Sequence, residues 1–457
     1  MAWSVVNPAT GKNERTYDET TWPEAARALS DAHAAHEAWR RTTFGDRARL
    51  MRQAAELLRE QAGRYAELMA VEMGKPVKDG RSEVEKCAWV CDYYADEAEG
   101  QLAPVQTDTP DTDARTYWAY EPLGVVLAIM PWNFPFWQVF RFAAPNLMAG
   151  NAGLLKHASN VPGCALAIEE VFRDAGFPNG LFKTLLIDHE LSERLIEQPL
   201  LRAVTLTGSV RAGKTVAAQA GSLIKKTVLE LGGSDAYVVL EDADLDAAVD
   251  TCVTSRLTNS GQSCIAAKRF VVVRELREDF ERLMVERMKS ARMGDPLDEA
   301  TELGPQARAD LRDELHDQVE RSLAAGARLL LGGEVPDGPG AFYPPTVLTD
   351  VRPGMPAYDE ELFGPVAAII EAEDEADAIR IANDSVFGLG AAVFTRDLER
   401  GERIARYELQ AGACFVNGHV RSDPRLPFGG IKESGYGREL SPLGIREFVN
   451  VKTVWVE

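Results

Sequence analysis

A continuous apolar run, GVVLAIM, occupies residues 124–130. Such a run is typical of a parallel strand that is buried on both faces of its sheet. A helical pattern follows at about residues 135–149. Further strand patterns come after it, at residues 152–156, 182–187, 203–207 and 226–231. Strands separated by helices predict βαβ units in a doubly wound parallel sheet, which binds ligands at the carboxyl ends of its strands.

The chain on either side of this region follows different patterns. Before it, three long helices are expected, at about residues 21–41, 46–73 and 78–100. After it, strand and helix patterns alternate again, with strands at residues 236–240, 269–273, 328–332, 366–370, 391–395 and 414–418. This second series predicts a second α/β unit. Residues 104–120 and 448–457 resemble exposed strands, whose unpaired edges favour pairing with another subunit.

The composition narrows the class of protein. A chain of 457 residues predicts two or three domains. Its formal net charge of −21 at pH 7 disfavours nucleic acid as a partner, because phosphate groups would be repelled. No segment approaches the roughly 18 apolar residues that can span a bilayer, and the start lacks the pattern of a secretory signal. We therefore expect a cytoplasmic protein without a membrane partner.

The cysteines do not suggest a disulfide framework in a chain of this length, although there are six of them. Cys87 and Cys91 lie four residues apart on a predicted helix, and no second pair of ligands lies near them in the sequence. No metal site is therefore expected. Most free cysteines are small buried hydrophobic residues, and we interpret every cysteine except Cys264 in this way.

Three polar residues occupy positions at which an α/β protein can form an active site. Asn133, in PWNFP, and Glu230, in ELGG, each follow a predicted strand, and Cys264 ends the glycine-containing segment NSGQSC. An asparagine amide can stabilise an oxyanion, a carboxylate can act as a base, and a thiolate is a nucleophile. Each residue also has an ordinary interpretation: a helix N-cap, a surface glutamate at a turn, and a buried thiol.

The combination of motifs is more specific than any one of them. PWNFP, LTGSVRAG, ELGG, GQSC and ELFGP occur in this order, and the chain resembles the NAD(P)-dependent aldehyde dehydrogenases. The resemblance covers essentially the whole chain, from NPATG near the start to PFGGIKESGYGRE near the end. It implies an α/β fold in which a Rossmann-type cofactor domain and a second α/β catalytic domain carry a β-arm for oligomerisation.

This resemblance sets the expected organisation of the chain. A dinucleotide-binding domain is expected to comprise residues 1–103 and 123–232, followed by a catalytic domain of residues 233–430. Residues 104–122 and 431–457 are expected to form the oligomerisation arm. The resemblance and the arm together imply a homodimer or a homotetramer.

The resemblance also implies roles for the three polar residues. Cys264 matches the family nucleophile, which attacks the aldehyde carbon to give a thiohemiacetal and then a thioester. The side chain of Asn133 and the backbone N–H of Cys264 match the groups that hold the oxyanion. Glu230 matches the base that activates water to hydrolyse the thioester, which implies a free carboxylic acid as the product.

The cofactor residues are likewise matched by resemblance. They are Trp132, Lys156, Ser159, Gly208, Ser209, Glu361 and Phe363. Gly208 and Ser209 precede a predicted helix whose N-terminus would face the pyrophosphate. Ser159 stands where many NAD-preferring members have a glutamate that grips the 2′-hydroxyl. Because serine removes the repulsion of a 2′-phosphate, we expect NADP to be preferred, with NAD also possible.

The substrate is indicated by residues after PWNFP. Trp137 and Arg141 lie four apart on the predicted helix and so share one face. Arg141 matches an arginine of family members that act on succinic semialdehyde, and an arginine can bind a carboxylate through two hydrogen bonds. A small aldehyde bearing a carboxylate is therefore expected, with succinic semialdehyde the leading candidate. Glutaric semialdehyde, another semialdehyde or a broad range of aldehydes remain alternatives.

The sequence leaves open which residue, besides Arg141, would bind the carboxylate of the substrate. Some succinic semialdehyde enzymes have another arginine where this chain has Thr258. Arg421 or Ser422 could take its place, or their loop could be a solvated turn with a local arginine–aspartate pair.

Three other functional classes fit the sequence less well. A dehydrogenase that transfers the acyl group to coenzyme A usually lacks the glutamate found here at Glu230. A non-catalytic binding protein has no need of the nucleophile Cys264. A thiol hydrolase would need a histidine base, and no histidine lies in the motifs near this cysteine.

Overall fold

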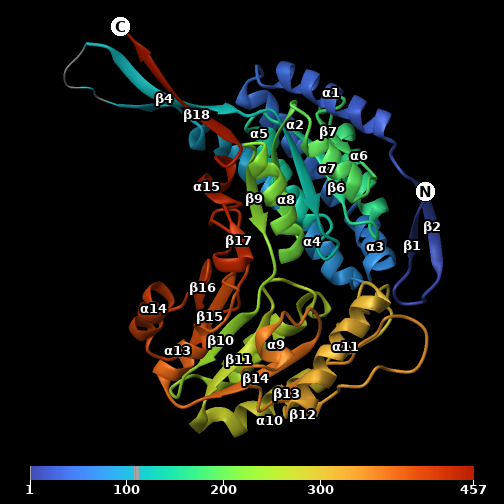
Figure 1. Cartoon of the computed structure of the whole chain (residues 1–457), viewed down its shortest axis with the longest axis vertical. Coiled ribbons are helices and arrows are strands. Elements are labelled where there is room, and N and C mark those ends of the chain that lie inside the picture. Colours follow the sequence, from blue (N-terminus) through green and yellow to red (C-terminus); the bar gives the residue numbers. More distant parts are fainter. Residues whose placement is uncertain (1, 108, 110–112) are drawn as a thin grey trace.

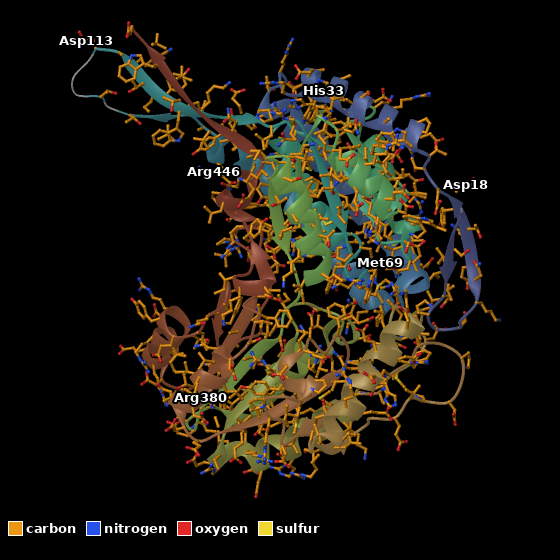
Figure 2. All side chains as sticks on the ribbon, viewed as in Figure 1. Asp18, His33, Met69, Asp113, Arg380 and Arg446 are labelled. Atoms are coloured by element: carbon orange, nitrogen blue, oxygen red, sulfur yellow. The ribbon has the colours of Figure 1, made fainter. Side chains whose placement is uncertain are left out.

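The computed structural model describes residues 2–107, 109 and 113–457. Two α/β bodies lie one above the other in Figure 1, and a thin β-arm projects from the upper one. Figure 2 shows Asp113 at the end of the arm, away from the side chains that fill the two bodies. No helix in the described part of the chain is both long enough and apolar enough to cross a membrane.

The upper body contains a six-stranded sheet. Its strand order is β17-β9-β8-β5-β6-β7, and only the short β17 is antiparallel to its neighbour. The strands are β5 Val125–Met130, β6 Ala152–His157, β7 Phe182–Thr184, β8 Leu201–Thr207, β9 Lys226–Glu230 and β17 Gly435–Tyr436. The predicted strand at residues 124–130 is confirmed as β5, and it is almost wholly buried, as expected of a central parallel strand.

Successive strands depart from β5 in opposite directions. The chain passes from β5 to β6 and β7 on one side, and then to β8 and β9 on the other. Such a reversal leaves a crevice outside the carboxyl ends of the strands on either side of it. The sheet therefore places a crevice after Met130, Thr207 and Glu230.

Helices surround this sheet. They are α1 Trp22–Trp39, α2 Phe44–Glu60, α3 Ala62–Met73, α4 Val77–Gln101, α5 Trp137–Met148, α6 Pro162–Asp174, α7 His189–Ile196 and α8 Val210–Ser222. The long helix α4 packs against α2, α3 and α5. This packing brings the middle of α4 to the start of α5, directly after the PWNFP segment.

The lower body contains a seven-stranded sheet of order β12-β13-β14-β11-β10-β15-β16, parallel except for the β12–β13 pair. The strands are β10 Asp235–Val239, β11 Ala267–Val273, β12 Arg328–Leu331, β13 Thr346–Thr349, β14 Val366–Ala372, β15 Gly390–Phe394 and β16 Ala413–Val416. The longer helices are α9 Leu245–Leu257, α10 Arg277–Lys289, α11 Ala309–Ala324, α13 Glu375–Asn383 and α14 Leu398–Tyr407. The shorter ones are η1 Thr258–Gly261, η2 Arg274–Leu276, α12 Pro356–Asp359, η3 Lys432–Ser434 and α15 Ser441–Ile445.

The arm is an antiparallel sheet of order β18-β4-β3. Its strands are β3 Val105–Gln106, β4 Arg115–Pro122 and β18 Val449–Val456. Part of the arm predicted over residues 104–122, namely residues 108 and 110–112, lies outside the described residues. Of residues 431–457, also assigned to the arm, Gly435–Tyr436 instead pair with β9 in the six-stranded sheet.

Several predicted boundaries are wrong. The helix expected over residues 46–73 is two helices, because the backbone of Gln61 leaves the helical range between α2 and α3. The strand expected over residues 182–187 ends at Thr184, because Leu186 instead exchanges hydrogen bonds with Thr20. A hairpin of β1 Ala2–Val6 and β2 Asn13–Asp18 was not predicted.

Candidate active site

The segment that carries Cys264 is held in an unusual conformation. Asn259, Ser260 and Gly261 have φ values of 54°, 56° and 75°, a left-handed region that non-glycine residues rarely adopt. A Cβ atom on Gly261 would lie 2.3 Å from the backbone of Gly364, so this position requires glycine. Arg256, at the end of α9, donates a hydrogen bond of 2.6 Å to the Gly261 carbonyl. These contacts fix the turn from which Cys264 emerges.

Asn133 lies against this turn. Its Nδ2 donates to the Gln262 carbonyl at 3.0 Å, and its Oδ1 accepts from Gln138 Nε2 at 3.1 Å. The Gln138 contact orients the Asn133 amide with its N–H groups toward the Cys264 turn. The backbone N–H of Cys264 makes no hydrogen bond to any described residue. One N–H of Asn133 and the N–H of Cys264 can therefore serve a bound oxygen atom.

The PWNFP segment is anchored from two directions. Glu83, on α4, accepts hydrogen bonds of 2.9 Å from the backbone N–H groups of Phe136 and Trp137, and it forms an ion pair with Lys75. His157, at the end of β6, contacts the Pro135 carbonyl at 2.9 Å through Nε2. Burial lowers the pKa of His157 to about 4, so the ring is neutral. Its Nδ1 accepts from the Ala158 N–H, and Nε2 therefore carries the proton that is donated to Pro135.

Glu230 ends β9 inside the protein. Its side chain is only slightly exposed, and neither carboxylate oxygen has a hydrogen-bond partner among the described residues. Burial raises the pKa of Glu230 well above its ordinary value, and the negative charge of Glu439 raises it further. A carboxylate with a raised pKa can act as a proton acceptor near neutral pH.

The two glycines after Glu230 permit close approach of other segments. A Cβ atom on Gly232 would lie 2.6 Å from the Glu361 carboxylate, and one on Gly233 would lie 2.7 Å from the Cys264 carbonyl oxygen. The Gly233 N–H donates to Glu361 at 3.0 Å. The ELGG segment thus brings Glu361 and Cys264 close to the end of β9.

Arg141 forms an ion pair with a carboxylate of the protein itself. Its Nε forms an ion pair with Glu439, and its guanidinium lies 4.6 Å from the centre of the Phe428 ring. Both charged side chains are almost fully buried. No motif in the sequence predicts that a carboxylate of the protein itself pairs with Arg141.

The thiol of Cys264 is predominantly protonated in this state. Burial raises its pKa to about 12, although the positive charges of Lys268 and Arg141 oppose the rise. Lys268 is fully buried and donates hydrogen bonds to the carbonyl groups of Ser263 and Cys264, at 2.9 and 2.8 Å. Its Nζ also lies 3.5 Å from the Glu361 carboxylate.

Two cavities meet at Cys264. The first, named here the β5–β8 cavity, has a volume of about 170 Å³ and lies at the carboxyl ends of β5, β8 and β9. It is lined in part by Trp132, Asn133, Gly208, Ser209, Gly232, Cys264, Glu361 and Phe363. The Trp132 and Phe363 rings meet edge to face with their centres 5.7 Å apart. Six residues matched to the cofactor or catalysis thus converge with the nucleophile on the crevice where the strand order reverses.

The β5–β8 cavity suits a dinucleotide. Ser209 caps α8 by accepting from the Ala212 N–H at 3.3 Å, so the helix begins beside the cavity and presents its positive end there. Lys156, near the end of β6, is buried but is not among the residues that line this cavity, and its ammonium has no hydrogen bond or ion pair with a described residue.

Ser159 is placed apart from that cavity. It is exposed on the loop after β6 and lines a separate cavity of about 540 Å³, shared with the N-terminal hairpin and the start of α11. The structure therefore puts Ser159 near Lys156 in the chain but does not bring it together with Gly208 or Glu361.

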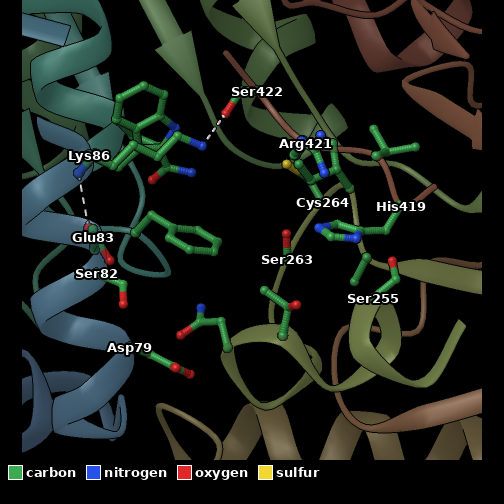
Figure 3. A pocket seen from close by; sticks show the side chains of 18 of the residues that line it. Asp79, Ser82, Glu83, Lys86, Ser255, Ser263, Cys264, His419, Arg421 and Ser422 are labelled. Atoms are coloured by element: carbon green, nitrogen blue, oxygen red, sulfur yellow. Dashed lines mark hydrogen bonds between the residues drawn. The ribbon is translucent and has the colours of Figure 1, made fainter. Parts of the chain in front are cut away.

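The second cavity, named here the α4–α5 cavity, has a volume of about 280 Å³. Figure 3 shows Cys264, Arg421 and His419 on one side of it and residues of α4 on the other. Trp137, Arg141, Arg421 and Ser422 all line it, as expected of residues that contact a substrate. In the same loop Asp423 pairs with Arg425, so the local ion pair also exists but does not involve Arg421.

Sequence reasoning missed the contribution of α4. Asp79, Ser82, Glu83 and Lys86 line the α4–α5 cavity, and Lys86 donates to Ser422 Oγ at 2.8 Å. No local motif marks these residues, because their neighbours in the sequence form an ordinary amphipathic helix. Only the packing of α4 against α5 brings them to the site.

Comparison with known proteins supports this geometry. The profile of the aldehyde dehydrogenase family matches residues 2–454. The chain is 50% identical, over the full length of both proteins, to a protein of Synechocystis named "Probable succinate-semialdehyde dehydrogenase [NADP(+)]" and to "Succinate-semialdehyde dehydrogenase [NADP(+)] 1" of Mycobacterium bovis. A solved succinic semialdehyde dehydrogenase from Streptococcus pyogenes, in complex with NADP+, superposes with a TM-score of 0.97 at 39% identity over all of both chains. On its sequence and its fold, this chain belongs to the aldehyde dehydrogenase family.

Proposed function

We propose that this protein oxidises succinic semialdehyde to succinate with NADP as the hydride acceptor. The observation that carries the proposal is the position of Cys264, which lines both the β5–β8 cavity and the α4–α5 cavity. A substrate in one cavity and a dinucleotide in the other would meet at its sulfur. The family and the names of the 50% identical relatives support the same reaction.

The first chemical step belongs to Cys264. The thiol first loses its proton to water. The resulting thiolate attacks the aldehyde carbon, and the carbonyl π electrons move to oxygen to give a thiohemiacetal oxyanion. The N–H groups of Asn133 and Cys264 that have no partner among the described residues stabilise this oxyanion. NADP, when bound in the β5–β8 cavity, supplies the acceptor for the hydride that leaves as the thioester forms.

The second chemical step belongs to Glu230. Its carboxylate removes a proton from a water molecule, whose oxygen attacks the thioester carbon and expels the Cys264 thiolate. The product is the free carboxylic acid. This buried carboxylate has a raised pKa and no hydrogen-bond partner in the described part of the chain, which suits the role and favours hydrolysis over transfer to coenzyme A.

The remaining predicted residues bind the two reactants. Trp132, Lys156, Gly208, Ser209, Glu361 and Phe363 would hold the dinucleotide, and Ser159 would leave room for its 2′-phosphate. Trp137 and Arg141 would line the path of the succinic semialdehyde chain, together with Arg421 and Ser422. Arg141 keeps Nη1 free of any described partner, although its Nε is paired with Glu439.

The arm supports assembly into a homodimer or homotetramer. β18 is the outer strand of its sheet, and the side chains of Val451 and Trp455 are 59% and 51% exposed. An exposed strand edge with apolar side chains favours pairing with a second copy. The domain boundaries and the cytoplasmic location expected from the sequence stay predictions.

Formation of NADPH from succinic semialdehyde and NADP tests the proposal, with wild type compared with Cys264→Ala. Wild type should reduce NADP and the variant should not, while both keep the same melting temperature. Lack of reduction by folded wild type, with either NADP or NAD, would contradict the proposed activity. If glutaric semialdehyde is turned over faster than succinic semialdehyde, the preferred substrate is the longer semialdehyde.

A further inference from the structure

Lys86 is a cation of the α4–α5 cavity that the chemical steps above leave without a role. It lies in the middle of α4, and its half-buried ammonium donates to Ser422 Oγ at 2.8 Å. The same ammonium lies 4.4 Å from the centre of the Trp137 ring. Figure 3 shows the Lys86–Ser422 contact and, elsewhere on the cavity wall, Cys264.

No carboxylate of the described residues forms an ion pair with Lys86. Glu83, one turn earlier on α4, is occupied by Lys75 and by two backbone N–H groups of the PWNFP–α5 junction. Asp423, next to Ser422, is paired with Arg425. An ammonium has three donors, and Lys86 uses one of them on Ser422. The other two have no hydrogen-bond acceptor among the residues that the structure describes, so they can bind an anion.

The other cations of the cavity are less suited to that task. Arg141 is already neutralised by the buried carboxylate of Glu439, and a second anion would compete with that ion pair. Arg421 is exposed, so water solvates its guanidinium and weakens any ion pair that it forms. Lys86 is the one of the three that is both partly removed from water and without a carboxylate partner among the described residues.

We propose that Lys86 and Ser422 together bind the carboxylate of the substrate and determine the preference for an acidic aldehyde. This inference rests on the proposed function, and it identifies a second anchor for the carboxylate of the substrate. The Ser422 hydroxyl accepts from Lys86, which leaves its own O–H to donate to a carboxylate oxygen. The Trp137 ring would then cover the methylene groups of the substrate while its aldehyde carbon faces Cys264.

The proposed anchor makes substrate binding depend on pH. Burial, and next the nearby Arg141, lower the pKa of Lys86 to about 8. The neighbouring charged and titratable groups are Glu83 and Cys87 of α4, Arg141 of α5, and His419, Arg421 and Asp423 of the loop that faces them. The KM for succinic semialdehyde should therefore rise as pH increases through this range and the ammonium loses its proton. Lys86→Arg should show no such rise, because a guanidinium stays charged.

The test compares succinic semialdehyde with butanal, which has the same carbon chain but no carboxylate. Lys86→Met should lower the ratio of kcat/KM for succinic semialdehyde to that for butanal by about 10- to 100-fold, the usual effect of losing a charge-assisted hydrogen bond. Lys86→Arg should keep most of the wild-type ratio. Lys78→Met is the matched control, because Lys78 lies on the same helix but is exposed and does not line the cavity.

The outcomes separate this inference from the proposed function. A wild type with no preference for succinic semialdehyde over butanal would overturn both. A wild type with that preference, together with an unchanged ratio in folded Lys86→Met, would overturn the role of Lys86 alone. If Lys86→Met does not fold, Ser422→Ala takes its place: a lower ratio supports the anchor and a wild-type ratio rejects it. Binding of succinate to the enzyme, measured by calorimetry, should weaken in the same variants.

Discussion

At the scale of single residues, the site is governed by buried charges that influence one another. Glu230, Glu439 and Arg141 lie in one buried group, in which the Glu439 charge raises the pKa of Glu230 and the Arg141 charge lowers it. The base is active only when Glu230 is deprotonated. The rate of thioester hydrolysis should therefore fall as pH decreases through the raised pKa of Glu230.

Glu439→Gln tests this electrostatic coupling. The substitution removes a neighbouring negative charge and keeps the shape of the side chain, so the pKa of Glu230 should fall. The acid limb of the kcat–pH profile should then move to lower pH, measured under conditions in which hydrolysis limits the rate. An acid limb that stays in place, or that moves to higher pH, would contradict the coupling.

Ser159 is the residue on which cofactor preference is expected to depend. Ser159→Glu adds a carboxylate that would repel a 2′-phosphate and accept a hydrogen bond from a 2′-hydroxyl. The ratio of kcat/KM for NADP to that for NAD should fall by at least about tenfold, equivalent to about 1.4 kcal/mol. Because Ser159 is exposed, the substitution should leave the melting temperature unchanged. An unaltered ratio would show that cofactor choice is made elsewhere.

At the scale of secondary-structure elements, α4 connects folding to catalysis. The Glu83 carboxylate satisfies two N–H groups at the start of α5 and is paired with Lys75, and all of these groups are buried. Removing one partner of a buried ion pair typically costs about 3–5 kcal/mol, since the other charge is left uncompensated.

Glu83→Ala should therefore lower both stability and activity. We expect a loss of about 3 kcal/mol in the free energy of unfolding, measured with denaturant, and a lower kcat because the Asn133 segment loses its anchor. Glu85→Ala is the control, because Glu85 lies on the exposed face of α4 and pairs only with the exposed Arg59 among the described residues. Equal effects of the two substitutions would exclude a special role for Glu83.

The sequence predicted elements well where burial imposes a pattern. β6 is buried along its whole length and β5 at every residue except Ile129, and their apolar runs identify them. β2 is almost wholly exposed, so its residues NERTYD carry no such pattern. The same distinction applies to the site: Cys264, Glu230 and Asn133 lie in recognisable motifs, whereas Lys86 and the Arg141–Glu439 pair depend on contacts between segments far apart in the chain.

At the scale of the whole molecule, the arm is the feature whose strand pairing is incomplete within a single chain. β18 pairs with β4 along its length, but its other edge is not paired in the arm sheet. Deleting residues 449–457 should remove this edge and shift the protein from an oligomer to a monomer, as measured by analytical ultracentrifugation. A deletion variant that keeps the mass of the wild-type assembly would show that contacts outside β18 hold the subunits together.

The proposed reaction passes through a covalent intermediate on Cys264, one of the six cysteines of the chain. The most direct measurement is intact and peptide mass spectrometry of Glu230→Gln after incubation with succinic semialdehyde and NADP. Because this variant lacks the base for hydrolysis, it should form one equivalent of NADPH and retain one succinyl group on Cys264. NADPH formation without that adduct, or an adduct on any other cysteine, would contradict the account.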